Sequence, residues 1–165
     1  MRLTGVRKWT IFLVPCLLAV FCYCAPADQR DTGSDVAIVV NENAPVSNLD
    51  MGELRKIFLG DRQYWTPDLP VIVIVRGPGS HERDVVLRVI YQMSELEFKR
   101  YWIAKIFRAE AVSAPKIVYS DAITNELVTA MPGAIGFVAA HDVTKGEKVV
   151  RIDGHLPGDP EYVLR

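Results

Sequence analysis

Residues 71–91 constrain the fold of this chain most, because they predict a strand, a tight loop and a helix in direct succession. Residues 71–75 are all valine or isoleucine, which is typical of a strand covered on both faces, as in a parallel sheet. Gly77-Pro78-Gly79 cannot continue that strand, and Ser80 can cap the helix that follows. Arg76 lies where the strand meets the loop. A guanidinium beside the free N–H groups of a helix start favours the binding of an anion.

Residues 1–27 are predicted to be a cleavable secretory signal peptide rather than part of the fold. Their start is basic, the apolar run over residues 10–22 is too short to span a bilayer comfortably, and Ala25-Pro26-Ala27 offers the small residues that a signal peptidase reads. We therefore expect cleavage after Ala27, a periplasmic or secreted location, and no transmembrane span in the mature chain. A retained N-terminal anchor is the alternative.

All the cysteines, Cys16, Cys22 and Cys24, lie in that predicted signal peptide. The mature chain would then have no disulfide framework, no cysteine nucleophile and no thiolate metal ligand. Lipid modification at Cys22 or Cys24 is a second alternative. It is disfavoured because Phe21 stands where a lipoprotein signal needs a small residue.

The size and charge of the chain predict one domain. Without residues 1–27, 138 of the 165 residues remain, with 16 basic and 20 acidic side chains and a net charge of −4. This length suits a single domain with one core, and the mild acidity argues against nucleic acid as a partner. Residues 28–35 are polar and are predicted to be a flexible lead-in, which leaves residues 36–165 as the folded domain.

Further strand and helix signals complete an α/β pattern. Residues 36–40 form a second fully apolar run, and shorter strands are predicted at residues 116–119, 134–138 and 148–152. Helix starts are predicted at Asp50, Ser94 and Ser120, whose side chains can cap a first turn. The helix after Ser94 is expected to bury Phe98, Trp102 and Ile106. The helix after Ser120 is expected to bury Ile123, Leu127, Ala130 and Met131. The pattern favours a mostly parallel sheet flanked by helices.

Four fragments of this chain, taken in order, carry a family resemblance. They are residues 37–41, residues 54–60 with Trp65, Arg76 with Gly79-Ser80 and Arg83, and residues 134–138. Together they resemble the phosphate-binding proteins of ABC transporters, which are type II periplasmic binding proteins. The resemblance is closest to short stand-alone members that hold about half of a full binding protein. It implies a single lobe of the type II periplasmic-binding-protein kind.

The resemblance also implies where an oxyanion would bind. The family's Arg-x-x-Gly-Ser-Gly-Thr-Arg pattern is matched at four positions, which are the predicted ligands: Arg76, Gly79, Ser80 and Arg83. His81 stands where the pattern has its second glycine, and Glu82 where it has threonine. A carboxylate at Glu82 competes with phosphate for the same N–H groups, and it repels a dianion by about a kcal/mol or more near a protein surface. The Ser/Gly loop of the family's first lobe has no counterpart in residues 28–35.

The predicted ligands also have purely structural interpretations. Arg76 can be a charged residue where a buried strand meets solvent, and Ser80 can be no more than a helix cap. Arg83 is explained equally well by an ion pair with Glu82 or Asp84.

The sequence shows no catalytic or metal-binding pattern. It has no HExxH, no paired-carboxylate spacing and no nucleophile elbow, so we expect neither an enzyme, nor a metal site, nor a cofactor. We expect a substrate-binding-protein-like domain that binds phosphate or a related oxyanion for ABC-type uptake or sensing. The alternative is a protein-interaction or sensor domain that kept the fold and lost its small ligand. A half-length binding protein exposes the face that a second lobe would cover, and that face can recruit a partner protein or a second copy to complete the cleft.

Overall fold

The computed structural model describes residues 35–111 and 113–165. The predicted signal peptide, and all of the predicted lead-in except Asp35, lie outside these residues. The described part of the chain is built on a five-stranded sheet. Its strands stand in the order β6 (Lys116–Val118), β5 (Ile72–Arg76), β7 (Ala134–Ala139), β1 (Val36–Asn41) and β8 (Glu147–Val149).

The directions of these strands confirm a mostly parallel α/β sheet. β5 runs parallel to both of its neighbours, β6 and β7. β1 runs antiparallel to both of its neighbours, β7 and β8, so it alone opposes the other strands of this sheet. The sequence does not indicate this reversal, because a strand that is apolar throughout fits a buried position in either direction.

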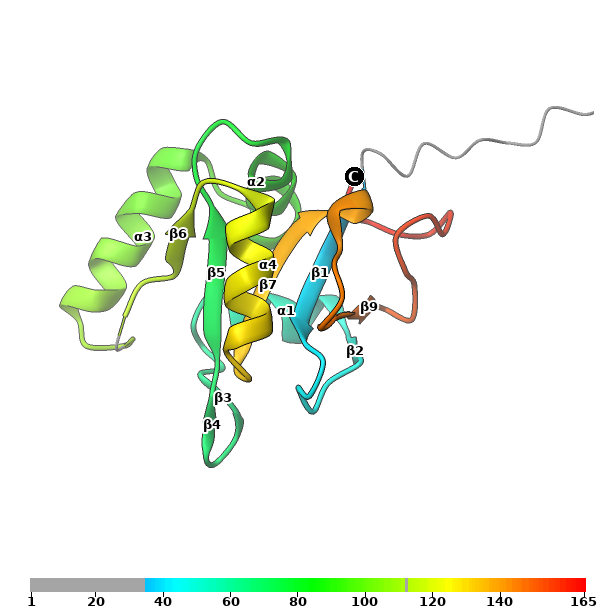
Figure 1. The fold of residues 1–165 in the computed structure, drawn as a ribbon. Helices are drawn as coiled ribbons and strands as arrows, with labels where there is room; N and C mark the ends of the chain where they lie inside the picture. Colours follow the sequence, from blue (N-terminus) through cyan, green and yellow to red (C-terminus); the bar gives the residue numbers. More distant parts are fainter. Residues whose placement is uncertain (1–34, 112) are drawn as a thin grey trace, which may run out of the picture.

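Helices cover both faces of the sheet (Figure 1). α4 (Asp121–Ala130) packs on β7, β1 and β5 on one face. α1 (Met51–Phe58), α2 (His81–Val86) and the π-helical turn η1 (Leu87–Tyr91) pack on the other. α3 (Glu95–Phe107) follows η1 and lies beside β6 at one edge of the sheet.

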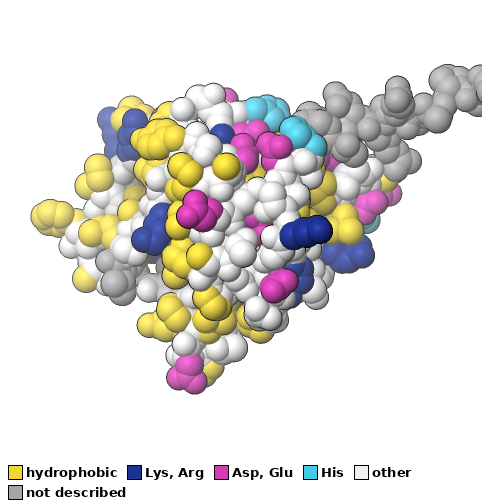
Figure 2. Space-filling view, viewed as in Figure 1, with side chains coloured by type: hydrophobic (Ala, Val, Ile, Leu, Met, Phe, Trp, Pro, Cys, Tyr) yellow, Lys and Arg dark blue, Asp and Glu magenta, His cyan; other side chains and the backbone are white. Residues whose placement is uncertain are grey.

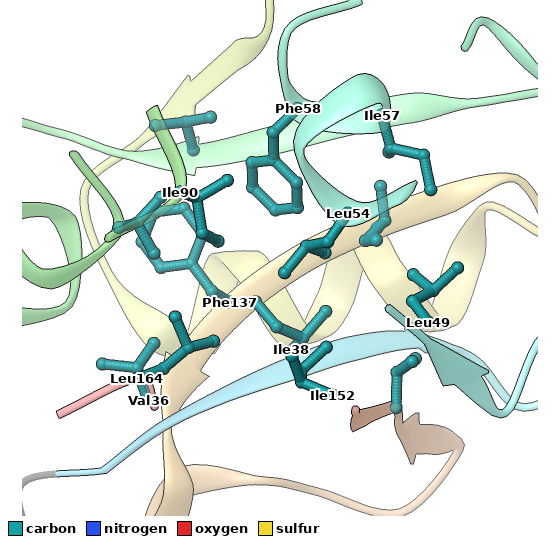
Figure 3. Packing of buried hydrophobic residues seen from close by; sticks show 14 of the residues in the cluster. Val36, Ile38, Leu49, Leu54, Ile57, Phe58, Ile90, Phe137, Ile152 and Leu164 are labelled. Atoms are coloured by element: carbon teal, nitrogen blue, oxygen red, sulfur yellow. The ribbon is translucent and has the colours of Figure 1, made fainter. Parts of the chain in front are cut away.

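Alternate residues of each central strand belong to two separate hydrophobic cores. Ile38 and Phe137 face the larger core, where they meet Leu54, Phe58 and Ile90 from the α1 and η1 side (Figure 3). The smaller core lies under α4 and is built from the opposite side chains of the same strands: Ala37, Val39, Ile74 and Val138, with Val128 of α4. This arrangement explains why β1 and β5 carry no polar alternation.

The predicted helix starts are confirmed. The side chain of Asp50 accepts a hydrogen bond from the backbone N–H of Glu53 at 2.7 Å. Ser94 and Glu97 form a reciprocal capping box. Ser120 likewise caps α4, accepting from the third residue on at 3.2 Å.

The predicted buried faces of α3 and α4 are partly wrong. In α3, Lys105 is buried in place of Ile106, and its ammonium group donates to the carboxylate of Asp61 and to the hydroxyl of Tyr101. The aliphatic stem of a lysine can lie on apolar surface when its charge is paired, which a hydrophobic pattern does not register.

The buried side chains of α4 are Thr124, Asn125 and Val128, whereas Ile123 is exposed. The helix lies so close to β7 that a Cβ at Gly136 would come within 2.9 Å of the Thr124 methyl group. Gly136 therefore marks a close approach of helix to strand. A small side chain fits there and isoleucine does not.

Minor elements complete the fold. A short parallel pair joins β2 (Asn48–Leu49) to β9 (Arg151–Ile152), a hairpin joins β3 (Tyr64–Thr66) to β4 (Leu69–Pro70), and a 3-10 turn, η2 (Ala140–Asp142), follows β7. The single strand predicted over residues 148–152 is in fact two strands, β8 and β9, in different sheets. The helices in the described part of the chain lack the length and apolar character that a membrane crossing needs.

The end of the chain returns to its first strand. Leu164 is buried, and its carbonyl accepts a hydrogen bond from the N–H of Val36 at 2.9 Å. The hydroxyl of Tyr162 donates to the carbonyl of Val36 at 2.6 Å. Arg165 forms an ion pair with Asp35 at 3.2 Å. The C-terminal residues 162–165 are therefore an integral part of the fold.

Candidate functional site

Arg76 is the last residue of strand β5, and its guanidinium lies between two carboxylates. Its Nη2 atom lies 3.3 Å from Oδ2 of Asp121, and its Nε atom lies 3.9 Å from Oε2 of Glu82. Only 9% of the residue is exposed. Within the described residues, its Nε and Nη1 atoms are buried without a hydrogen-bond acceptor. Buried polar groups normally find a partner, so this arginine has donors to offer to something else.

A hollow of about 370 Å³ lies against this guanidinium. It is lined by Arg76, Gly77, Pro78, Gly79, Ser80, Glu82 and Tyr119. The hollow lies outside the carboxyl end of β5, which is where open α/β sheets bind ligands. Three of the four predicted ligands therefore line one hollow.

Gly79 and Ser80 present polar groups to this hollow. Gly79 has a φ of +88°, and no described residue other than its chain neighbours has an atom within 4 Å of the place where its Cβ would be, so its backbone is open to a ligand. The Oγ of Ser80 accepts the N–H of Arg83 at 3.2 Å, which leaves the hydroxyl proton to donate. Ser80 is therefore a helix cap and can bind an anion at the same time.

The fourth predicted ligand, Arg83, does not line the hollow. Its guanidinium is 1% exposed, its Nη1 donates to the carbonyl of Arg76 at 2.5 Å, and its Nε and Nη2 donate to both carboxylate oxygens of Glu95 at 2.9 and 3.0 Å. The same group lies over the ring of Phe98, 4.7 Å from its centroid. The alternative pairing with Glu82 or Asp84 is thus replaced by a pairing with Glu95 of α3. Arg83 fixes the end of β5 from behind the hollow.

Asp121 is the residue of this site that the sequence analysis missed. It comes from the first turn of α4, directly after β6 and the cap Ser120. Because β6 runs parallel to β5, their carboxyl ends meet at one edge of the sheet, and this places Asp121 beside Arg76. The strand predicted at residues 116–119 and the cap predicted at Ser120 place Asp121 just past the carboxyl end of a strand. That position is the sequence signal that could have identified Asp121 as a site residue.

The carboxylates set the charge of the site. Burial raises the pKa of the Asp121 carboxyl above its ordinary value of 3.8, the positive charge of Arg76 opposes that rise, and the negative charges of Glu82 and Asp142 add to it. When both of its neighbouring carboxylates are ionised, Arg76 is outnumbered. An incoming anion must therefore compete with Glu82, whose side chain reaches the hollow from α2.

A second hollow, of about 330 Å³, lies at the opposite end of β5. Val71, Trp102 and Pro115 are among its lining residues. Its described lining residues include no counterpart of the buried guanidinium at Arg76, so we do not choose it as the candidate anion site. In the described residues, no three histidine, cysteine, aspartate or glutamate side chains are placed to hold a metal ion.

Comparison with known proteins gives one family match. The family model described as "PBP superfamily domain" matches residues 32–158.

Solved structures with a similar fold include an ABC-type phosphate transport receptor from Vibrio cholerae, with a TM-score of 0.60, 24% identity, and coverage of 74% of this chain and 48% of that one. A putative phosphate ABC transporter substrate-binding protein with bound phosphate from Clostridium perfringens has a TM-score of 0.60, 21% identity, and coverage of 74% of this chain and 46% of that one. This chain thus spans about half the length of these proteins. At such identities the similarity establishes the fold alone.

Proposed function

The chain belongs to the PBP superfamily, and from that membership we propose that it is a periplasmic or secreted binding domain that captures a small oxyanion, phosphate or a relative, without chemical reaction. The observation that carries this proposal is the buried guanidinium of Arg76, which has two donors without acceptors among the described residues, beside a hollow at the carboxyl end of β5. Proteins of similar fold that are named as phosphate receptors support the choice of anion. The setting would be ABC-type uptake or sensing.

In this proposal, Arg76 supplies the charge, while the N–H of Gly79 and the hydroxyl of Ser80 bind the oxygens of the anion. Arg83 supports the site without contacting the anion, because it donates a hydrogen bond to the carbonyl of Arg76 and does not line the hollow. The carboxylate of Glu82 must move aside for an anion to approach Arg76. The resulting affinity is low, since every bound anion replaces an ion pair that the protein already has.

Calorimetric titration of phosphate into three variants tests the proposal. Unit charges about 4 Å apart interact by about 4 kcal/mol at an effective dielectric constant of 20. Because the hollow is open to water, we take a smaller value for the gain in phosphate-binding free energy when the Glu82 charge is removed. Our lower bound is about 1.4 kcal/mol, which corresponds to a tenfold change in affinity. Glu82→Thr should therefore bind phosphate at least about tenfold more tightly than the native chain. Arg76→Met should abolish binding.

Asp84→Thr is the matched control. It removes a carboxylate from the same helix, α2, at an exposed position that does not line the hollow. It should leave the affinity within about threefold of the native value, since exposed charges of this kind are screened by solvent. The proposal fails if neither the native chain nor Glu82→Thr gives heat or a thermal shift at millimolar phosphate, because a bound ligand must stabilise the fold by mass action.

The second candidate is a domain that kept the fold, lost the small ligand and recognises a protein. Two observations favour it: the carboxylate of Glu82 beside Arg76, and the large apolar side chains that are exposed on α3, β6 and α4 (Figure 2). Failure of Glu82→Thr to bind phosphate would favour this candidate. Recovery of phosphate binding in that variant alone would indicate that the native site has been closed to phosphate.

A further inference from the structure

The hollow at Arg76 contains groups of both charge signs. Two guanidinium donors of Arg76, Nε and Nη1, are buried without an acceptor among the described residues, and only 9% of the residue is exposed. Glu82 lines the same hollow, and its carboxylate oxygen Oε2 lies 3.9 Å from Nε of Arg76. That distance is longer than a hydrogen bond, so the ion pair leaves both partners able to bind a ligand. The hollow therefore offers donors to an anion and an acceptor to a cation.

A bare oxyanion would use only half of this site. It would lie beside Arg76 and place a second negative charge next to the carboxylate of Glu82, where like charges repel. An ammonium group on the same ligand would instead pair with Glu82 while the oxyanion pairs with Arg76. Asp121 lies 3.3 Å from Nη2 of Arg76 without lining the hollow, so its ion pair is kept in either case. A ligand with both charges thus leaves neither Arg76 nor Glu82 without a partner.

An aromatic ring lines the hollow as well. Tyr119 directly follows β6, and Figure 1 shows the connections after β5 and β6 at the same end of the sheet. Its ring lies against Gly77, where a Cβ would come within 2.5 Å of Cδ1 and Cε1 of the tyrosine. Tyr119 is nevertheless 76% exposed, so its ring is open to a ligand. A carboxylate and an aromatic ring are both favourable partners for an ammonium group.

We propose that the ligand of this site is a zwitterion, namely a phosphonate or phosphate monoester that carries a primary amine on a short carbon chain. This inference rests on the proposed oxyanion binding and names the class of oxyanion. The oxyanion accepts from Arg76 and Ser80, and the ammonium group lies against Glu82 and Tyr119. Because Arg76 and Glu82 are only 3.9 Å apart, two carbons between the charged groups are enough to reach both. The hollow of about 370 Å³ is of a size that small organic ligands occupy, about 300–1,000 Å³.

Calorimetric titration of 2-aminoethylphosphonate and ethylphosphonate at neutral pH tests the inference, because the two compounds differ only in the amine. The native chain should bind the aminoethyl compound at least about twentyfold more tightly, since a hydrogen bond between charged groups and a cation–π contact together correspond to such a factor. Glu82→Gln keeps the size of the side chain and removes its charge. This variant should bind the two compounds within about threefold of each other, the remainder being the contact with the ring.

Asp84→Asn is the matched control, because it neutralises an exposed carboxylate of α2 that does not line the hollow. It should keep the native preference for the amine. Tyr119→Leu should reduce that preference about two- to fivefold. Thermal unfolding monitored by circular dichroism checks that the variants fold, and the comparison of the two compounds on the native chain needs no variant.

The inference and the oxyanion proposal fail in different ways. Similar affinities of the native chain for both compounds, no binding of 2-aminoethylphosphonate, or a preference for the amine that survives in Glu82→Gln would each overturn the zwitterion. Binding of phosphate to Glu82→Thr would still support the oxyanion proposal in each of these cases, because that test involves no amine. If Glu82→Thr also fails to bind phosphate and the native chain binds neither compound, both are overturned.

Discussion

Replacing Arg83 by methionine should destabilise the fold without removing a residue that lines the hollow. The guanidinium makes three hydrogen bonds, two to Glu95 and one to the carbonyl of Arg76. Leaving that carbonyl buried without a donor costs about 1–3 kcal/mol, and hydrogen bonds to a charged group contribute about 1.5–3 kcal/mol. Because 35% of the Glu95 side chain stays in contact with water, we take the lower part of these ranges. Methionine keeps much of the packing on Phe98, so the expected loss is about 2–4 kcal/mol.

Urea denaturation of the variant measures this loss as a change in the free energy of unfolding. Lys99→Met is the matched control, because Lys99 pairs with the same Glu95 at 3.8 Å but its side chain is 60% exposed. That control should change the free energy of unfolding by less than about 0.5 kcal/mol. If Arg83→Met is as stable as the control while its phosphate affinity falls, Arg83 is a ligand and its supporting role is refuted.

The pH dependence of the same variant provides a second check. The hydrogen bond from Arg83 lowers the pKa of Glu95 below its ordinary value of 4.5, against a smaller opposing effect of burial. A carboxyl whose pKa is lowered by folding stabilises the fold above its unfolded pKa, and this contribution disappears as the pH falls through the lowered value. The difference in unfolding free energy between the native chain and Arg83→Met should therefore be largest near neutral pH and shrink in acid. A difference that stays constant with pH would contradict this account.

Two further substitutions test the packing that holds the site's scaffold together, with urea denaturation as the measurement. Gly133→Ala should cost about 1–3 kcal/mol or prevent folding, because its Cβ would lie 2.0 Å from the carbonyl oxygen of Pro70; a stability equal to the native value would contradict this close approach. Tyr162→Phe should lower the free energy of unfolding by about 1–3 kcal/mol, because it leaves the carbonyl of Val36 without its donor. An unchanged denaturation midpoint would show that this hydrogen bond does not contribute to stability.

The sequence is sufficient for those parts of the fold that depend on local chemistry. The caps at Asp50, Ser94 and Ser120 are confirmed because a side chain and an N–H three residues on determine them. The sequence is insufficient where distant segments decide the outcome. In α4, the buried Thr124 lies against Gly136, a residue of the distant strand β7. In α3, the ion pair with Asp61 allows Lys105 to be buried in place of Ile106.

The same division applies to the candidate site. Arg76, Gly79 and Ser80 line one hollow because they are neighbours in a single strand–loop–helix unit. Asp121 could not be placed beside Arg76 without the pairing of β5 with β6. The environment of Arg83 depends on Glu95, a residue of the next helix, so the sequence pattern alone does not separate a ligand from a support. The roles of all these residues in binding stay predictions until the titrations are done.

The hydrogen bond between Val36 and Leu164 and the ion pair between Asp35 and Arg165 bring the two ends of the described fold together. A domain with adjacent ends can be inserted as one continuous segment into a loop of another protein, or it can be circularly permuted. The exposed hairpin turn at Pro67 and Asp68 offers a position for new ends. A lobe of this kind can therefore pass between longer and shorter proteins through a single insertion or excision, without rearrangement of its sheet.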